Sequence, residues 1–426
     1  MGIFNWGFRT DIRITQGKDE HSAVIANTAT GDKVRLDTFF KNAMPSLDVN
    51  KKLWLHPLLF NGTLQTLYYA KHDSSDKYLI YYGRELFTYK DGGICSLDWV
   101  IPEPQDKHQF VEEYKSTLPE GWPKLHPRSR FFSESELADR KAAGQEDITK
   151  PLVVVLHGLG GGSHEPLIRN LADNIHKNSP GWDTVVINTR GCCRTKVTTG
   201  KLFTGLSTGD VREPLVEMRK RYPKREIYAV GFSFGAAMLA NYLGEHDDAS
   251  QDDGIVKAAC LIGCPWDFVD SNYHLNSSYT GQYLLNPSLS LFLTKIVTNN
   301  FGELNGAQPE IFNQVNVTKC KRAKKTLVFD DLFTCRVAGF NNPWEYYREV
   351  SPANRIKNIR VPTLVLNSID DPAVGCRLPY MDIERNPNVV LVETDLGGHL
   401  GWVKSNGDFW CVEVAEEYFH KFNQWT

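Results

Sequence analysis

The stretch that decides the fold is Gly231-Phe232-Ser233-Phe234-Gly235, which stands between two runs of different character. Residues 227–230 form a short apolar run, as in a buried strand, and residues 236–240 are helix formers rich in alanine. A serine at such a strand-to-helix turn sits in a tight backbone, where flanking glycines remove the Cβ atoms that would collide. The pattern predicts a serine hydroxyl exposed at the carboxyl edge of a sheet.

A serine in this position has the surroundings of a nucleophile. The helix that follows has a partial positive charge at its start, and the backbone N–H of Phe234 can donate to an oxyanion. The simpler alternative is a glycine-rich turn without chemistry. The strand before the serine and the helix after it favour the nucleophile, so we expect Ser233 to be catalytic.

Composition limits the class of protein. The 426 residues are 41% hydrophobic and 23% charged, with a formal net charge of −3, which gives no basic surface for nucleic acid. No leader pattern and no run of about 20 apolar residues is present, so we expect an intracellular protein, soluble or peripheral on a membrane. Nine cysteines at irregular places predict free thiols, and their spacing with histidine resembles no zinc site.

The pattern of apolar and polar residues changes at Pro151. From there short apolar runs alternate with amphipathic stretches, which predicts an α/β fold with a doubly wound, mostly parallel sheet. The serine turn within this alternation indicates the α/β-hydrolase fold. The expected strands are 152–156, 184–187, 227–230, 256–262, 363–366 and 389–392, and the expected helices are 165–176, 210–221, 234–243 and 410–422.

The rest of the chain divides around this alternation. Residues 1–148 are polar and aromatic-rich, and we interpret them as an N-terminal extension or cap. Residues 149–426 form the predicted hydrolase domain. Within it, the interval of about 265–347 breaks the alternation and is rich in leucine and phenylalanine, which predicts an inserted lid. An ordinary helical excursion that covers the sheet is the alternative.

The expected acid and base follow the serine in the order that this fold uses. The strand 363–366 runs into a polar turn with two aspartates before Pro372, and we expect Asp371 to orient the base, with Asp370 as a competitor that caps turn N–H groups. The strand 389–392 leads into a Gly-Gly loop that presents His399. We therefore expect His399 to take the proton of the serine.

A glycine-rich turn follows the strand 152–156 and predicts the second oxyanion donor, the N–H of Leu159. A phosphate-binding loop is excluded because no Gly-Lys-Ser/Thr sequence follows. His157 and His164 in this turn are interpreted as hydrogen-bonding struts. Cys192, on the next loop, could be a nucleophile only if a histidine faced it.

Taken together, these motifs resemble those of a known family. The chain is similar to the fungal medium-chain fatty acid ethyl ester synthase/esterases, in the branch of α/β hydrolases that also holds mammalian phospholipase-like and bacterial putative esterase proteins. The family triad falls on Ser233, Asp371 and His399, and Phe232 departs from relatives that often carry cysteine there. The motifs that carry the resemblance are 61–68, 91–99, 119–123, 157–165, 188–192, 231–235, 241–245, 370–372 and 397–399.

The resemblance implies acyl transfer through an acyl-enzyme on Ser233. Medium-chain acyl-CoA, ethanol and medium-chain esters are the implied substrates, with Leu291 and Phe292 lining an acyl tunnel and with no metal and no bound cofactor. A monoacylglycerol lipase or phospholipase acting at a lipid surface is the alternative, and a catalytically silent scaffold is a third possibility. The resemblance also implies a cytoplasmic protein or one attached peripherally to lipid droplets or the mitochondrial outer membrane.

Overall fold

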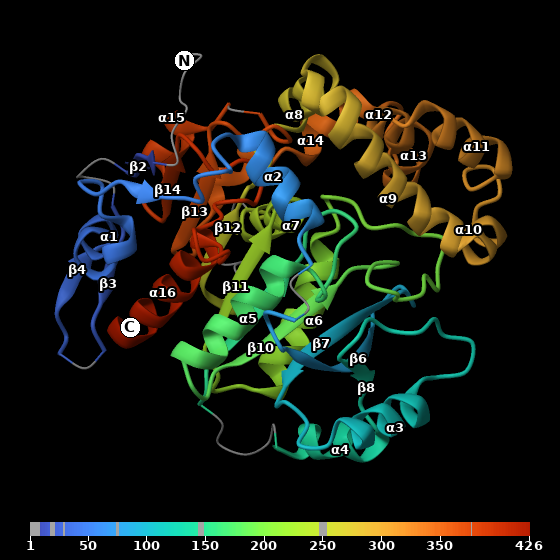
Figure 1. The fold of residues 1–426 in the computed structure, drawn as a ribbon, viewed down its shortest axis with the longest axis horizontal. Helices are drawn as coiled ribbons and strands as arrows, with labels where there is room; N and C mark the ends of the chain where they lie inside the picture. Colours follow the sequence, from blue (N-terminus) through green and yellow to red (C-terminus); the bar gives the residue numbers. More distant parts are fainter. Residues whose placement is uncertain are drawn as a thin grey trace. The chain divides into compact units, whose positions relative to one another are not determined.

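The computed structural model describes residues 9–17, 22–28, 30–73, 76–143, 149–246, 254–375 and 377–426. The chain forms two compact units, each made of separate stretches of sequence (Figure 1). Unit 1 comprises residues 1–73, 228–286 and 347–426, and unit 2 comprises residues 74–227 and 287–346. The predicted boundary at residue 148 lies outside the described residues, so that domain division stays a prediction.

Unit 1 contains the strands that carry the predicted triad. The order of neighbouring strands is β2-β14-β13-β12-β11, and β12, β13 and β14 are parallel, whereas β2 pairs antiparallel with β14. Two small antiparallel pairs, β1 with β5 and β3 with β4, complete its strands. The bounds are β1 Arg9–Thr10, β2 Ile12–Thr15, β3 Val24–Ala26, β4 Lys33–Arg35, β5 Leu53–Trp54, β11 Ile227–Phe232, β12 Val256–Ile262, β13 Thr363–Ser368 and β14 Val389–Thr394.

Unit 2 has strands in the order β9-β10-β7-β6-β8. β9 and β10 are parallel, and so are β6 and β8, whereas β7 pairs antiparallel with both β10 and β6. β9 is Leu-Val-Val-Val-Leu with every residue buried, as expected for a strand covered on both faces. The bounds are β6 Tyr81–Thr88, β7 Ile94–Ile101, β8 Ser129–Phe131, β9 Leu152–Leu156 and β10 Asp183–Asn188.

Each predicted strand and helix is present, and the α/β-hydrolase fold class is confirmed. The helices are α1 Leu36–Ala43, α2 Gly62–Lys71, α3 Lys107–Thr117, α4 Glu134–Ala143, α5 Pro166–Asn178, α6 Thr208–Arg221, α7 Phe234–Leu243, α8 Phe268–Ser277, α9 Asn286–Asn299, α10 Phe301–Ala307, α11 Gln314–Ala323, α12 Thr326–Phe329, α13 Cys335–Ala338, α14 Pro343–Val350, α15 Tyr380–Arg385 and α16 Trp410–Trp425. The interval predicted as a lid is helical from α8 to α14, and its role as a lid stays a prediction.

Helices from the first and the last stretch of unit 1 pack on each other. In Figure 1, α1 (blue) lies beside α16 (red), although α1 ends at residue 43 and α16 begins at residue 410. The ring of Phe39 lies 5.8 Å from that of Phe422 and 6.5 Å from that of Trp425, and Phe40 stacks on Tyr418 at 5.2 Å. Edge-to-face and offset aromatic pairs of this kind add to the stability gained by burial. The first part of the chain is therefore built into the core around the triad strands.

Candidate active site

Ser233 sits on the sharp turn that the sequence predicts. It follows β11 directly and precedes α7, with φ at 52° and ψ at −116°. Its N–H donates to the carbonyl of Ile262 at 2.8 Å, which ties the turn to β12. A Cβ at Gly231 would lie 2.6 Å from the Cα of Ala236, so only glycine allows the helix to start this close to the strand. The turn holds the serine in a left-handed conformation that is costly for a non-glycine residue.

Three side chains of unit 1 form a continuous hydrogen-bonded chain. The Oγ of Ser233 lies 2.7 Å from the Nε2 of His399, and the Nδ1 of His399 lies 2.8 Å from the Oδ2 of Asp371. The Asp371 side chain is fully buried. Its other oxygen accepts from the N–H groups of Ala373 and Val374, at 2.8 and 3.1 Å. A carboxylate held in this way keeps the proton of the imidazole on Nδ1 and leaves Nε2 free to accept the proton of the serine.

Asp370, the competing acid, has different partners. One of its carboxylate oxygens accepts from the N–H groups of Gly397 and Gly398, at 3.1 and 2.8 Å, and from the hydroxyl of Ser368 at 2.6 Å. Burial raises the pKa of Asp370 above its ordinary value. Asp370 therefore holds the loop that presents His399, whereas Asp371 contacts the imidazole itself.

A helix from the N-terminal part of the chain also holds this loop. The Oγ of Thr66, on α2, accepts from the backbone N–H of His399 at 2.8 Å while donating to the carbonyl of Gly62 at 2.6 Å. Asp370 leaves no room for a side chain at Gly62, because a Cβ there would lie 2.1 Å from its carbonyl oxygen. Sequence reasoning missed this contribution, since nothing in residues 61–71 indicates which loop they contact.

Comparison with known proteins agrees with this geometry. Residues 151–403 match the family described as alpha/beta hydrolase fold. The chain belongs to the α/β-hydrolase family. It is 40% identical to the medium-chain fatty acid ethyl ester synthase/esterase 2 of Saccharomyces cerevisiae, over 99% of this chain and 97% of that protein. The monoacylglycerol lipase of the same yeast is 35% identical over 87% of this chain and 80% of the lipase. Human phospholipase ABHD3 is 28% identical over 76% of this chain and 68% of the phospholipase.

These findings confirm the resemblance to the fungal synthase/esterases. Membership of the α/β hydrolases and the similarity to proteins named as esterase and lipase support ester hydrolysis by this hydrolase. Among the described residues, no helix combines the length and the apolar character needed to cross a membrane.

The remaining predicted site residues of the hydrolase lie in different places. Phe234 is the first residue of α7 and follows Ser233 directly, whereas Leu159 follows β9 in unit 2. Leu291 and Phe292 lie on α9 in unit 2, with exposed fractions of 54% and 49%. The oxyanion role of the first pair and the acyl-binding role of the second pair stay predictions.

The histidines of the turn after β9 differ from each other. His157 bridges the backbone of this turn, because its Nδ1 contacts the carbonyl of Gly158 at 2.7 Å and its Nε2 accepts from the N–H of Thr189 at 3.1 Å. It is thus a hydrogen-bonding strut. His164 instead has its Nδ1 3.6 Å from the sulfur of Cys193. The sequence motif alone did not pair His164 with a cysteine, because Cys193 comes from the loop after the next strand.

Proposed function

We propose that this hydrolase transfers medium-chain acyl groups through an acyl-enzyme on Ser233. Water as the acceptor gives hydrolysis of medium-chain esters, and ethanol as the acceptor gives fatty acid ethyl esters from medium-chain acyl-CoA. The observation that carries the proposal is the hydrogen-bonded chain from Ser233 through His399 to Asp371. The fungal synthase/esterase that covers nearly the whole chain supports the choice of acyl group and acceptor.

The reaction follows from the positions of these atoms. Nε2 of His399 takes the proton of Ser233 as the oxygen attacks the carbonyl carbon, and Asp371 stabilises the imidazolium that forms. The oxyanion would accept hydrogen bonds from the N–H groups of Phe234 and Leu159. The imidazolium then gives its proton to the leaving alkoxide or CoA thiolate, which leaves the acyl group on the serine. An incoming water or ethanol repeats these steps in reverse order.

The choice between the two acceptors does not depend on the triad. The same base deprotonates water or ethanol, so the access of water to the acyl-enzyme and the concentration of the alcohol decide the product. We therefore propose that one site serves both synthesis and hydrolysis.

The experiment is a paired assay of wild type and Ser233→Ala. One arm supplies octanoyl-CoA with ethanol, and the other supplies ethyl octanoate in water. We expect both activities to vanish in Ser233→Ala and to persist in Ser135→Ala, which changes an exposed serine of α4. Either activity surviving in Ser233→Ala would refute the serine mechanism. Hydrolysis without ester formation in the wild type would limit the protein to esterase chemistry.

The similarity to a yeast monoacylglycerol lipase favours a second candidate function. The catalytic residues would be the same, so a monoacylglycerol dispersed in micelles has to be compared with ethyl octanoate as substrate. A higher kcat/KM for the monoacylglycerol would favour the lipase. Labelling of wild type with a fluorophosphonate probe, lost in Ser233→Ala, separates either enzyme from a silent scaffold, which would not be labelled.

The proposed acyl-binding residues can be tested through chain length. If Leu291 and Phe292 line the acyl site, replacing either with Trp will shorten the preferred acyl chain. The measurement is kcat/KM for a series of ethyl esters with roughly four to twelve carbons in the acyl chain, because an apolar site discriminates between substrates that differ by one methylene group. Lys295→Ala, an exposed change on the same helix, serves as the control. An unchanged chain-length profile in both Trp variants would remove them from the acyl site.

A further inference from the structure

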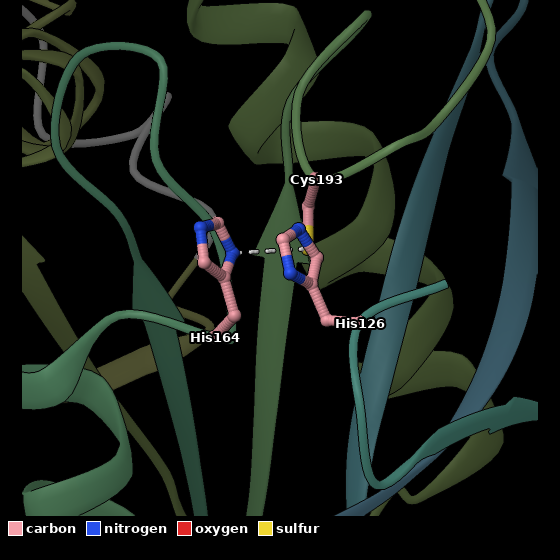
Figure 2. Close-up of side chains that lie close together, drawn as sticks. All are labelled: His126, His164 and Cys193. Carbon is pink, nitrogen blue, oxygen red and sulfur yellow. Dashed lines mark hydrogen bonds between the residues drawn. The ribbon is translucent and has the colours of Figure 1, made fainter. Parts of the chain in front are cut away.

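Unit 2 holds a second cluster of reactive side chains, which the serine chemistry does not use. His126, His164 and Cys193 each offer one possible ligand atom, and these atoms all lie within 4.8 Å of one another. Figure 2 shows the two imidazole rings facing each other with the sulfur of Cys193 beside them. The ring centroids are 3.8 Å apart and nearly parallel, at 3°. Three separate loops supply the three side chains, before β8, after β9 and after β10.

The donor atoms suit a particular class of ion. Imidazole nitrogen together with cysteine sulfur is the set preferred by zinc and other borderline transition metals, whereas magnesium and calcium need oxygen. A tetrahedral zinc ion binds sulfur at about 2.3 Å and nitrogen at about 2.0–2.1 Å, so its ligands lie about 3–4 Å apart. The separation of 3.6 Å between His164 Nδ1 and Cys193 Sγ lies in this range. The two imidazole rings are stacked in parallel, so they would turn out of the stack to direct both nitrogens at one ion.

The surroundings of Cys193 are built to hold a thiolate. Arg84 donates to its carbonyl oxygen at 2.9 Å and to its sulfur at 3.3 Å. The charge of Arg84 is neutralised by Asp98, whose two oxygens accept from it at 2.7 and 2.8 Å, so the guanidinium does not repel a cation at the sulfur. Hydrogen bonds of this kind to a ligand atom orient it and tune the metal.

The loop geometry brings the sulfur close to the histidines. A Cβ at Gly162 would lie 2.4 Å from the Cβ of Cys193, so a side chain there would push the two loops apart. Cys193 itself has φ at 49°, a left-handed conformation that is uncommon for cysteine. Ser163 fixes the same loop by donating to Asp98 at 2.5 Å. The backbone is thus shaped so that the Cys193 thiol faces His164.

We propose that His126, His164 and Cys193 form a three-ligand site for a divalent zinc-type metal ion, with water or an added ligand in the fourth position. The thiol proton is released to solvent when the metal binds. The ion would join three loops of unit 2 and stabilise them, because metal binding to a folded site adds its free energy to folding. This proposal departs from the expectation that the chain carries no metal, and it is independent of the acyl transfer assigned to Ser233.

The test is metal binding by the full-length protein. Wild type stripped with a chelator and then dialysed against zinc should retain about one ion per chain, the stoichiometry of a single site. Cys193→Ser and His126→Asn should each retain less than about a tenth of that, since each removes one of only three ligands. Cys192→Ser is the matched control, because it changes the neighbouring buried cysteine and should bind as the wild type does.

Cobalt gives a second readout. Bound to the wild type, it should show a thiolate-to-metal charge-transfer band that is lost in Cys193→Ser and kept in Cys192→Ser. Circular dichroism shows whether each variant is folded. If Cys193→Ser does not fold because this cysteine is buried, His126→Asn still tests the site. Equal zinc retention by wild type and both ligand variants, or none by the wild type, would overturn the site. Loss of zinc in the two ligand variants, with ester hydrolysis at the wild-type rate, would support the metal site and leave the acyl-transfer proposal unchanged.

Discussion

Asp370 and Asp371 are neighbours in the chain, yet their carboxylates accept hydrogen bonds from different groups. Asp371 accepts from the imidazole of His399, and Asp370 accepts from the backbone of the loop that carries this histidine. A carboxylate that only accepts hydrogen bonds from backbone N–H groups and a hydroxyl can be replaced by an amide oxygen. One that fixes the tautomer of a base cannot.

This difference predicts unequal effects of two equivalent substitutions. We expect Asp371→Asn to lower kcat for ester hydrolysis by about 10³- to 10⁴-fold, because the amide would favour the wrong tautomer of His399. Asp370→Asn keeps an acceptor for Gly397 and Gly398 and should cost roughly tenfold or less, about the effect of one weakened hydrogen bond. Initial rates on ethyl octanoate measure both. Equal losses would contradict the division of roles.

His157 makes the stability of the fold sensitive to acid. Burial lowers its pKa to about 4, and its Nε2 accepts a backbone N–H, so protonation would place two N–H groups against each other. Between about pH 6.5, the ordinary value for histidine, and pH 4 the unfolded chain binds this proton and the folded chain does not. Stability from this residue is therefore complete above pH 6.5 and falls as the pH drops towards 4.

We expect the free energy of unfolding to decrease by on the order of 1 kcal/mol per pH unit in this window because of His157. Urea unfolding at a series of pH values measures the slope, and His157→Gln, which cannot titrate, should reduce it. A slope that is the same in the variant would assign the acid sensitivity to other groups.

At the scale of elements, α2 bonds directly to the loop that carries His399. Replacing Thr66 by Val keeps the shape of the side chain but removes the acceptor for the N–H of His399. We expect kcat to fall about tenfold, the cost of one buried unpaired donor, with KM unchanged, because Thr66 acts on the loop that carries His399.

The same helix supplies the control for this prediction. Thr63 lies one turn earlier, and its hydroxyl bonds that of Thr280. Thr63→Val should leave the kcat of ester hydrolysis near the wild-type value. A comparable loss in both variants would show that α2 contributes only to folding, and a loss in KM alone would place Thr66 at the substrate instead.

The elements that sequence reasoning found and missed differ in one physical respect. The runs predicted as strands consist mostly of apolar residues, such as the five of β9, and their hydrophobicity identifies them. Strands β6 and β7 were not predicted, because they bury charges that neutralise each other. Arg84 and Asp98 are almost completely buried and form two hydrogen bonds with each other. A prediction from residue type places both on the surface, because charged residues are mostly exposed.

The candidate site shows the same division. The order of strands, turns and motifs was enough to select Ser233, Asp371 and His399, because chain order in this fold fixes which strand ends meet. It could not select Thr66, nor join His126 to Cys193. Those contacts depend on how loops far apart in the sequence fold against each other, and no local pattern records that.

For the molecule as a whole, unit 1 depends on the packing of the two ends of the chain. Phe39 is 2% exposed and contacts the rings of α16. Phe39→Ala should lower the free energy of unfolding by about 3–5 kcal/mol, the usual cost of emptying a buried phenylalanine site. Trp54, also in unit 1, is 55% exposed, so Trp54→Ala should change the free energy of unfolding by only roughly 0.5 kcal/mol. Thermal and urea unfolding measure both, and similar losses would contradict the packing described.

The eight cysteines in the described part of the chain are all buried and free of disulfide bonds, which makes the protein suitable as its own reporter. A thiol reagent such as Ellman's would react with these sulfurs only after the surrounding structure opens. The rate of colour development would then follow opening of the native state without any attached dye. Cys376 lies outside the described residues, and a Cys376→Ser background would remove its signal. Replacing the cysteine of β7, β12, α11 or α16 by serine, one at a time, would show which segment opens first, because the phase of that segment would be lost.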